Sequence, residues 1–194
     1  MTKESRFSLV LENRDMKSDY EKSDVPYKMW GDMVIGIRHI LLENQSTLQW
    51  EYVTNKLLNE LGCTFEELYN KAYKEDERHG YVMRGLLEQI GNNPLLGKTK
   101  ADKYKKLSEH QQIFILTNEE NVNGATVMLH KEFLTKAADK LKGGLVIAAM
   151  STHQVLCISE KAPNDLKKTL EKMLKDETKK DKSLSTELIY WFPE

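Results

Sequence analysis

The chain has 194 residues, of which 40% are hydrophobic and 30% are charged, and its formal net charge is −1. This composition is enough for a globular core and excludes wholesale disorder. The balance of charge also excludes the broad positive field on which general nucleic-acid coating depends.

The cysteines, histidines and apolar runs exclude further classes of protein. Cys63 and Cys157 lie far apart in the chain, so they offer neither a disulfide framework nor the ligand spacing of a zinc site. The five histidines form no paired ligand motif, and we expect no metal and no other cofactor. No signal-peptide run follows Met1, and no segment approaches the roughly 20 apolar residues that cross a bilayer. We therefore expect a cytoplasmic protein without a membrane partner.

Strand signals dominate the first 53 residues. Phe7, Leu9 and Leu11 alternate with their neighbours and predict a half-buried strand, whereas residues 13–24 show no periodicity and predict a loop. Residues 33–42 fit either a helix or a strand. Because residues 47–53 alternate cleanly after a short polar connection, the two segments together predict a hairpin.

Three helices are expected next. The first is capped by Asn55, buries Leu57, Leu58 and Leu61, and ends at Gly62. Residues 64–67 read Thr-Phe-Glu-Glu, a capping box in which the Thr64 hydroxyl and the Glu67 carboxylate each bind a backbone N–H of the other residue. The i, i+3, i+4, i+7 spacing of apolar residues at 83–90 predicts the third helix.

The second half predicts strands, helices and a repeated pattern. The expected strands and helices lie, in chain order, at residues 113–116, 125–130, 133–141, 145–150, 155–158, 163–174 and 188–192. Two strands followed by a helix recur at 33–61, 113–141 and 145–175, which predicts an α+β fold of largely antiparallel sheet covered by helices. The expected divisions are an N-terminal lobe at 1–96, a basic linker at 97–112 and a C-terminal lobe at 113–194.

An asparagine-rich turn at residues 118–124 is explained by structure alone. Asn123-Gly124 is a strong hairpin signal, because both residue types tolerate the positive φ of a type I′ turn. Asn118 and Asn121 can satisfy backbone groups in a wider loop. A binding site is not required there.

Ser151-Thr152-His153 is the best candidate for catalysis. A serine nucleophile needs a histidine within hydrogen-bond reach, but in an extended chain Ser151 and His153 would lie about 6.6 Å apart. Turn chemistry explains the three residues as well as catalysis does. A catalytic His153 would also need a carboxylate within hydrogen-bond reach.

A basic strip precedes the second half of the chain. It is formed by Lys98, Lys100, Lys103, Tyr104, Lys105 and Lys106. Such a strip can follow a nucleic-acid backbone and stack a base on its aromatic ring, but a solvated linker explains it better in a chain of neutral balance. Gly97-Lys98-Thr99 lacks the spacing of a phosphate-binding loop.

Several short motifs resemble a bacterial family, the domain of unknown function five-six-eight-eight. They are Val25-Pro26, Gly31-Asp32-Met33-Val34, Val53-Thr54-Asn55, Gly62 to Tyr69, Leu116-Thr117-Asn118, Asn123-Gly124-Ala125 and Ser151-Thr152-His153-Gln154. The resemblance covers most of the chain, and it implies a further N-terminal region that this chain lacks. The family pattern has Glu where this chain has Gln154, which removes a carboxylate that could orient His153. The resemblance also implies a place among mobile-element genes.

We expect a non-catalytic accessory protein that binds a macromolecular partner, either a protein or a nucleoprotein complex. The resemblance implies an anti-defence factor, for example an inhibitor of a CRISPR nuclease. The strand near Phe7, the hairpin around residue 44 and the basic strip are the expected contact surfaces. One alternative is a hydrolase or nuclease that uses Ser151 and His153, and the other is a nucleic-acid binder that uses the basic strip.

Overall fold

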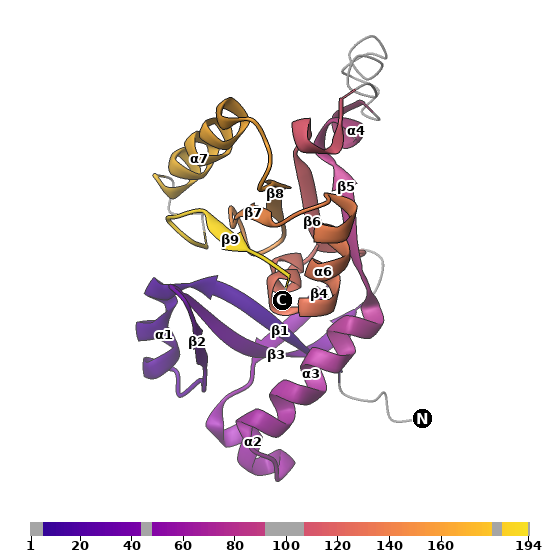
Figure 1. The fold of residues 1–194 in the computed structure, drawn as a ribbon. Coiled ribbons are helices and arrows are strands. Elements are labelled where there is room, and N and C mark those ends of the chain that lie inside the picture. The colour runs from indigo at the N-terminus through magenta and orange to yellow at the C-terminus, as the bar shows by residue number, and fades with distance from the viewer. Residues whose placement is uncertain (1–5, 44–47, 92–106, 180–183, 194) are drawn as a thin grey trace. The chain divides into compact units, whose positions relative to one another are not determined.

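The computed structural model describes residues 6–43, 48–91, 107–179 and 184–193. The chain divides into two compact units, Met1–Gly80 and Tyr81–Glu194. Each unit contains one sheet with helices (Figure 1), and every strand pair among the described residues is antiparallel. The predicted α+β class is confirmed.

Strand β3 (Met33–Glu43) is the centre of the first sheet. Strand β1 (Arg6–Asn13) pairs along one side of it. Strands β2 (Lys28–Trp30) and β4 (Leu48–Tyr52) pair with opposite ends of β3. The predicted hairpin is therefore confirmed as β3 and β4.

The predicted loop at residues 13–24 is wrong, because it contains a 3-10 turn (Arg14–Met16) and helix α1 (Lys17–Lys22). The Asn13 side chain accepts the N–H of Asp15 and so begins the turn. Tyr20 is almost fully buried and anchors the helix. One buried aromatic ring holds this short helix against the sheet, and a single residue leaves no periodicity to detect in the sequence.

Helices α2 (Asn55–Leu61) and α3 (Phe65–His79) begin and end as local chemistry dictates. Thr54, and not Asn55, is the N-cap of α2, and Gly62 ends it in the left-handed conformation with φ of 66°. The predicted capping box of Thr64 and Glu67 opens α3. Leu61 was expected to be buried, but its side chain is 43% exposed.

The second sheet has the strand order β5-β6-β8-β7-β9. Its strands are β5 (Tyr81–Gly85), β6 (Phe114–Asn118), β7 (Leu145–Ala148), β8 (Val155–Ser159) and β9 (Ile189–Trp191). Its helices are α4 (Leu86–Gly91), α6 (Lys131–Lys140), α7 (Asn164–Thr178) and two 3-10 helices (Glu109–Gln111 and Gly124–Leu129). Apolar side chains of α7 and of one sheet face form a buried cluster that includes Ile115, Val146, Leu156, Leu170 and Leu174.

Two predictions of secondary structure in the second unit are wrong. Residues 83–90 were expected to be helical, but Tyr81–Gly85 form a strand that pairs with β6, and only then does α4 begin. Four apolar residues at helical spacing are too few to exclude a strand that leads into a helix. For this reason the first unit ends at Gly80, earlier than the lobe boundary expected after residue 96. Residues 92–106, with most of the expected linker, lie outside the described residues.

The expected strand at residues 125–130 is a 3-10 helix. β6 pairs with β5 and β8, so this segment does not return beside it. The strand, strand, helix pattern therefore holds at 33–61 and 145–175, while strand, 3-10 helix and α-helix take its place at 113–141. Among the described residues, no helix combines the length and the apolar character needed to cross a membrane.

Candidate functional site

Ser151 and His153 lie in the turn between β7 and β8 and are held there by backbone hydrogen bonds. Ser151 Oγ accepts the N–H groups of His153 and Gln154, each at 3.3 Å. The ring of His153 is exposed, and its Nδ1 accepts the N–H of Asn123 at 3.2 Å. Ser151 thus acts as a turn former, and His153 binds a neighbouring loop.

Two segments that are far apart in the sequence meet at this turn, and together they form what we call the Asn–His junction (residues 117–125 and 151–154). Thr117 Oγ1 donates to the carbonyl of His153 at 2.8 Å, and the Ala125 N–H donates to the carbonyl of Thr152 at 3.1 Å. Asn118 holds the loop from inside, because its side chain both donates to the carbonyl and accepts the N–H of Val122. The junction joins β6, the 3-10 helix and the β7–β8 turn.

The asparagines of the loop serve its backbone shape. Asn121 and Asn123 have φ of 56° and 55°, in the left-handed region that asparagine tolerates better than most residues. Gly124 has no positive φ, so the predicted type I′ hairpin is wrong at its second residue. Its missing side chain instead lets the loop approach β6 and the turn. Asn123 Oδ1 is buried and has no hydrogen-bond partner among the described residues.

The junction supports a structural role for both residues of the predicted catalytic pair. Within the described parts of the chain, no carboxylate pairs with the ring of His153, although the enzyme hypothesis requires one. The Ser151 hydroxyl contacts backbone groups and not the His153 ring. The catalytic use of these residues stays a prediction.

Replacing His153 with alanine should lower the free energy of unfolding by about 1 kcal/mol, because the buried Asn123 loses the acceptor of its N–H. Gln154→Ala in the same turn is the control, with an expected change within about 0.5 kcal/mol for an exposed side chain. Urea unfolding of both variants measures the difference. Equal stability of the two variants would contradict the structural role of His153.

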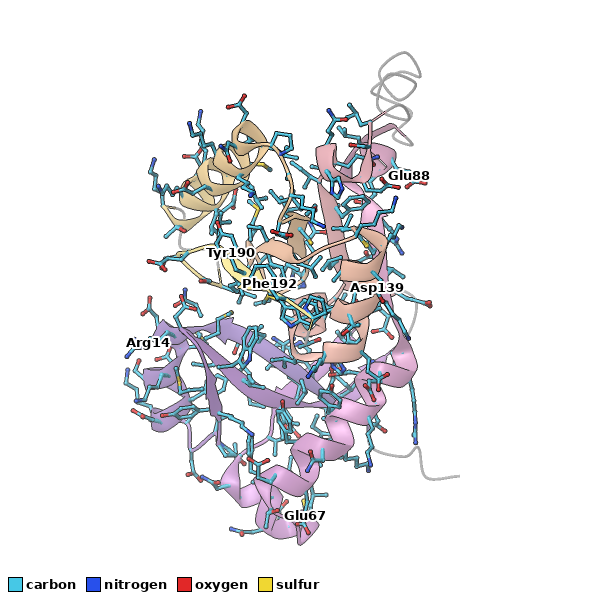
Figure 2. The ribbon with its side chains drawn as sticks, viewed as in Figure 1. Arg14, Glu67, Glu88, Asp139, Tyr190 and Phe192 are labelled. Atoms are coloured by element: carbon cyan, nitrogen blue, oxygen red, sulfur yellow. The ribbon has the colours of Figure 1, made fainter. Side chains whose placement is uncertain are left out.

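The first unit has an open apolar groove on its surface. We call it the Phe7 groove, and it is lined by Phe7, Leu61, Cys63, Glu67, Leu68 and Lys71. Its volume is about 270 Å³. Figure 2 marks its rim residue Glu67 at the end of α3 that follows α2. The expected contact surface near Phe7 falls on this groove, whereas the expected surfaces at residue 44 and in the basic strip up to Lys106 lie outside the described residues.

The groove lies where helix α2 ends and helix α3 begins. Gly62 reverses the chain after α2, which leaves Leu61 uncovered, and the capping box then starts α3 at once. The Thr64 N–H and hydroxyl both donate to the Glu67 carboxylate, and these hydrogen bonds lower the pKa of Glu67. Lys71 Nζ lies 5.4 Å from the centroid of the Phe7 ring. The groove therefore combines an apolar lining with the ammonium group of Lys71.

Beside the groove, two carboxylates of α3 bind the outer edge of strand β1. Glu75 Oε2 accepts the N–H of Phe7 at 3.0 Å, and Asp76 Oδ2 accepts the N–H of Leu9 at 2.9 Å. The hydroxyl of Ser8 donates to Asp76 Oδ1 at 2.8 Å. Unpaired strand edges invite pairing with other chains, and here side chains of α3 occupy that edge.

Burial raises the pKa of Asp76 to about 7, against the hydrogen bonds from Leu9 and Ser8 and the charge of Arg6, which lower it. An unfolded aspartate has a pKa near 3.9, so the folded first unit binds the proton more tightly than the unfolded one. The stability from this group is therefore complete below about pH 4. It is lost as the pH rises toward 7.

We expect Asp76→Asn to abolish this part of the pH dependence, which is at most about 1.4 kcal/mol per pH unit between pH 4 and 7. Urea unfolding at pH 5, 6 and 7 measures it. A Trp191→Phe background leaves Trp30 and Trp50, both in the first unit, as the fluorescent reporters. An unchanged slope in Asp76→Asn would show that another group titrates instead.

A second polar cluster, which the sequence did not indicate, is buried in the first sheet. Glu12 and Arg38 are 8% and 5% exposed, and their nearest charged atoms lie 3.6 Å apart. The hydroxyls of Tyr20 and Tyr52 both donate to Glu12, and burial together with the Glu12 charge raises the pKa of both tyrosines. The Arg38 guanidinium stacks 3.8 Å from the ring centroid of Trp50. The residues of this cluster come from four separate segments, so no local residue spacing in the sequence predicts it.

Across the described residues, no three histidine, cysteine or acidic side chains are grouped to hold a metal ion. No curated protein and no solved structure matches the chain. A protein-family model, described as a family of unknown function, matches residues 11–192 of the 194. This range covers the described strands from within β1 to β9, and both the Asn–His junction and most of the Phe7 groove. The chain therefore belongs to the family of unknown function DUF5688.

Proposed function

We propose that this protein is a non-catalytic accessory protein that binds a macromolecular partner through the Phe7 groove. The observation that carries the proposal is an apolar groove of about 270 Å³ whose lining includes Leu61, a leucine that is 43% exposed. Interface energy concentrates where one large side chain enters a pocket of the partner. A cavity of about 150 Å³ already accepts benzene, so this groove has room for an aromatic or branched aliphatic side chain.

The hydrogen bonds of the Asn–His junction also support binding over catalysis. They use Ser151 and His153 to join backbone segments, as turn residues do. A partner in a host defence system, such as a CRISPR nuclease, is the more specific proposal that the sequence resemblance implies. It rests on that resemblance alone.

An affinity capture from the natural host lysate tests the proposed function. Tagged wild-type protein and Leu61→Glu are compared, each with and without nuclease, by mass spectrometry. The expected result is one enriched protein that survives nuclease and is lost with Leu61→Glu, because a charge in the groove opposes burial of an apolar anchor. Met29→Glu is the matched control, since Met29 is also an exposed apolar residue of the first unit, 40% exposed, but does not line the groove.

The other outcomes separate the remaining hypotheses. A partner lost on nuclease treatment would favour nucleic-acid binding through the basic strip. A partner retained by Leu61→Glu would place the interface elsewhere. No partner at all would contradict the proposal and return attention to His153.

A further inference from the structure

We propose that the Phe7 groove selects a protein segment in which one large apolar side chain is flanked by acidic residues. This inference rests on the proposed function and names the chemistry of the partner. It follows from the charges around the groove, where the carboxylates are already bound by local donors and the ammonium groups are not.

The acidic side chains of α3 near the groove already have hydrogen-bond or ion-pair partners within the first unit. Glu67 is held by Thr64 in the capping box, and Glu66 pairs with Lys28 at 3.3 Å. Glu75 and Asp76 accept the outward N–H groups of β1. Their oxygens already accept hydrogen bonds or an ion pair within the unit, so a basic partner would have to compete with these local donors.

Two lysines on the same helix remain available. Lys71 lines the groove, and Lys74 follows it by three residues, a spacing that places both on one side of α3. Both are exposed, and neither pairs with a carboxylate among the described residues. Lys71 contacts the Phe7 ring, so its ammonium is held at the apolar mouth of the groove.

The apolar part and the charged part of this site would contribute differently to partner binding. Burial of one apolar side chain against Phe7, Leu61 and Leu68 would supply most of the affinity. Carboxylates beside that anchor would meet Lys71 and Lys74, and exposed charge pairs of this kind change the association rate and the choice of partner more than the affinity. An acidic segment with an apolar anchor satisfies both parts of the site, whereas a basic segment satisfies only one.

Selection of random twelve-residue peptides displayed on phage, against the full purified chain, tests the inference without a known partner. The expected consensus has a large aromatic or aliphatic residue flanked by Asp or Glu. A synthetic consensus peptide should lose about tenfold or more in affinity when its anchor becomes Ala, as expected for an interface hot spot. Exchanging its carboxylates for Lys should cost a few-fold, the range of exposed ion pairs.

Charge reversal on the protein gives the sharper test. Lys71→Glu/Lys74→Glu should reverse the preference, so that the peptide with Lys at the flanking positions binds better than the acidic one. Lys56→Glu is the matched control, because this exposed lysine of α2 already pairs with Glu60 and does not line the groove. Its preference should remain that of the wild type.

Cys63 reports whether the peptide enters the groove. It lines the groove and is partly exposed, whereas the other cysteine, Cys157, is fully buried, and burial raises the pKa of its thiol. The acidic consensus peptide should slow alkylation of Cys63 by N-ethylmaleimide. A peptide that binds without protecting Cys63 lies elsewhere and would overturn the inference.

The outcomes distinguish this inference from the proposed function. A consensus that is basic or has no charge preference, while Leu61→Glu still abolishes lysate capture, would overturn the inference and leave the function standing. Failure to select any peptide above background would also overturn it. Peptides and lysate partner that both persist with Leu61→Glu would overturn the inference and the role of the groove together.

Discussion

Replacing Gly124 with alanine is expected to destabilise the second unit by about 3 kcal/mol or more, because the Asn–His junction has no room for a methyl group. A Cβ at this position would lie 2.1 Å from Thr117 Oγ1 and 2.6 Å from both the Asn118 nitrogen and the His153 carbonyl oxygen. Two of these three atoms belong to the backbone of neighbouring segments, so no side-chain rotation relieves the contact.

Gly85→Ala is the matched control for this substitution. Gly85 is also a buried glycine of the second unit, but a Cβ there would meet its neighbours at 3.6 Å or more, which is ordinary van der Waals contact. We expect a change within about 1 kcal/mol. Hydrogen exchange of peptides from β6 and β8, read by mass spectrometry, measures the stability of the second unit in both variants. Equal protection in the two would show that the junction opens without cost.

Replacing Glu12 with leucine should destabilise the first unit by about 3–5 kcal/mol. The substitution leaves the buried guanidinium of Arg38 without its counter-charge and the hydroxyls of Tyr20 and Tyr52 without their acceptor. Urea unfolding with Trp30 and Trp50 as reporters measures the loss. Glu51→Leu is the control, because that glutamate pairs with His39 at an exposed site and should cost within about 0.5 kcal/mol.

A double-mutant cycle identifies the cause of that loss. Glu12→Leu/Arg38→Leu removes both charges, so the double variant should be more stable than the sum of the two single losses predicts, by at least about 1 kcal/mol. Additive losses would mean that packing against Trp50 and Tyr20, and not the buried charge, dominates.

Parts of the site were within reach of the sequence. The alternating apolar residues around Phe7 predicted a strand, which is β1, and Phe7 also lines the groove. The contact surface expected there stays a prediction. Leu61 was assigned to the core because it continues the apolar face of α2. Whether such a face is buried depends on which distant segment packs against it, and the local sequence pattern does not predict that contact. The groove joins β1 to the α2–α3 corner across more than 50 residues of chain.

The sequence by itself determined those features that depend on neighbours within a few residues. The capping box of Thr64 and Glu67, the left-handed Gly62 and the alternating strand at 48–52 all formed as predicted, because their hydrogen bonds and side-chain directions are set locally.

Tertiary structure decided the rest. Residues 125–130 became a 3-10 helix because Ala125 bonds to Thr152 and Gly124 packs against His153, and both of those partners lie nearly 30 residues away. Asp76 has a raised pKa because it is buried in the folded unit, although its hydrogen bonds from Leu9 and Ser8 in β1 lower the pKa. In each case a contact between distant segments, with its steric and dehydration cost, outweighed the weak preference of the local sequence.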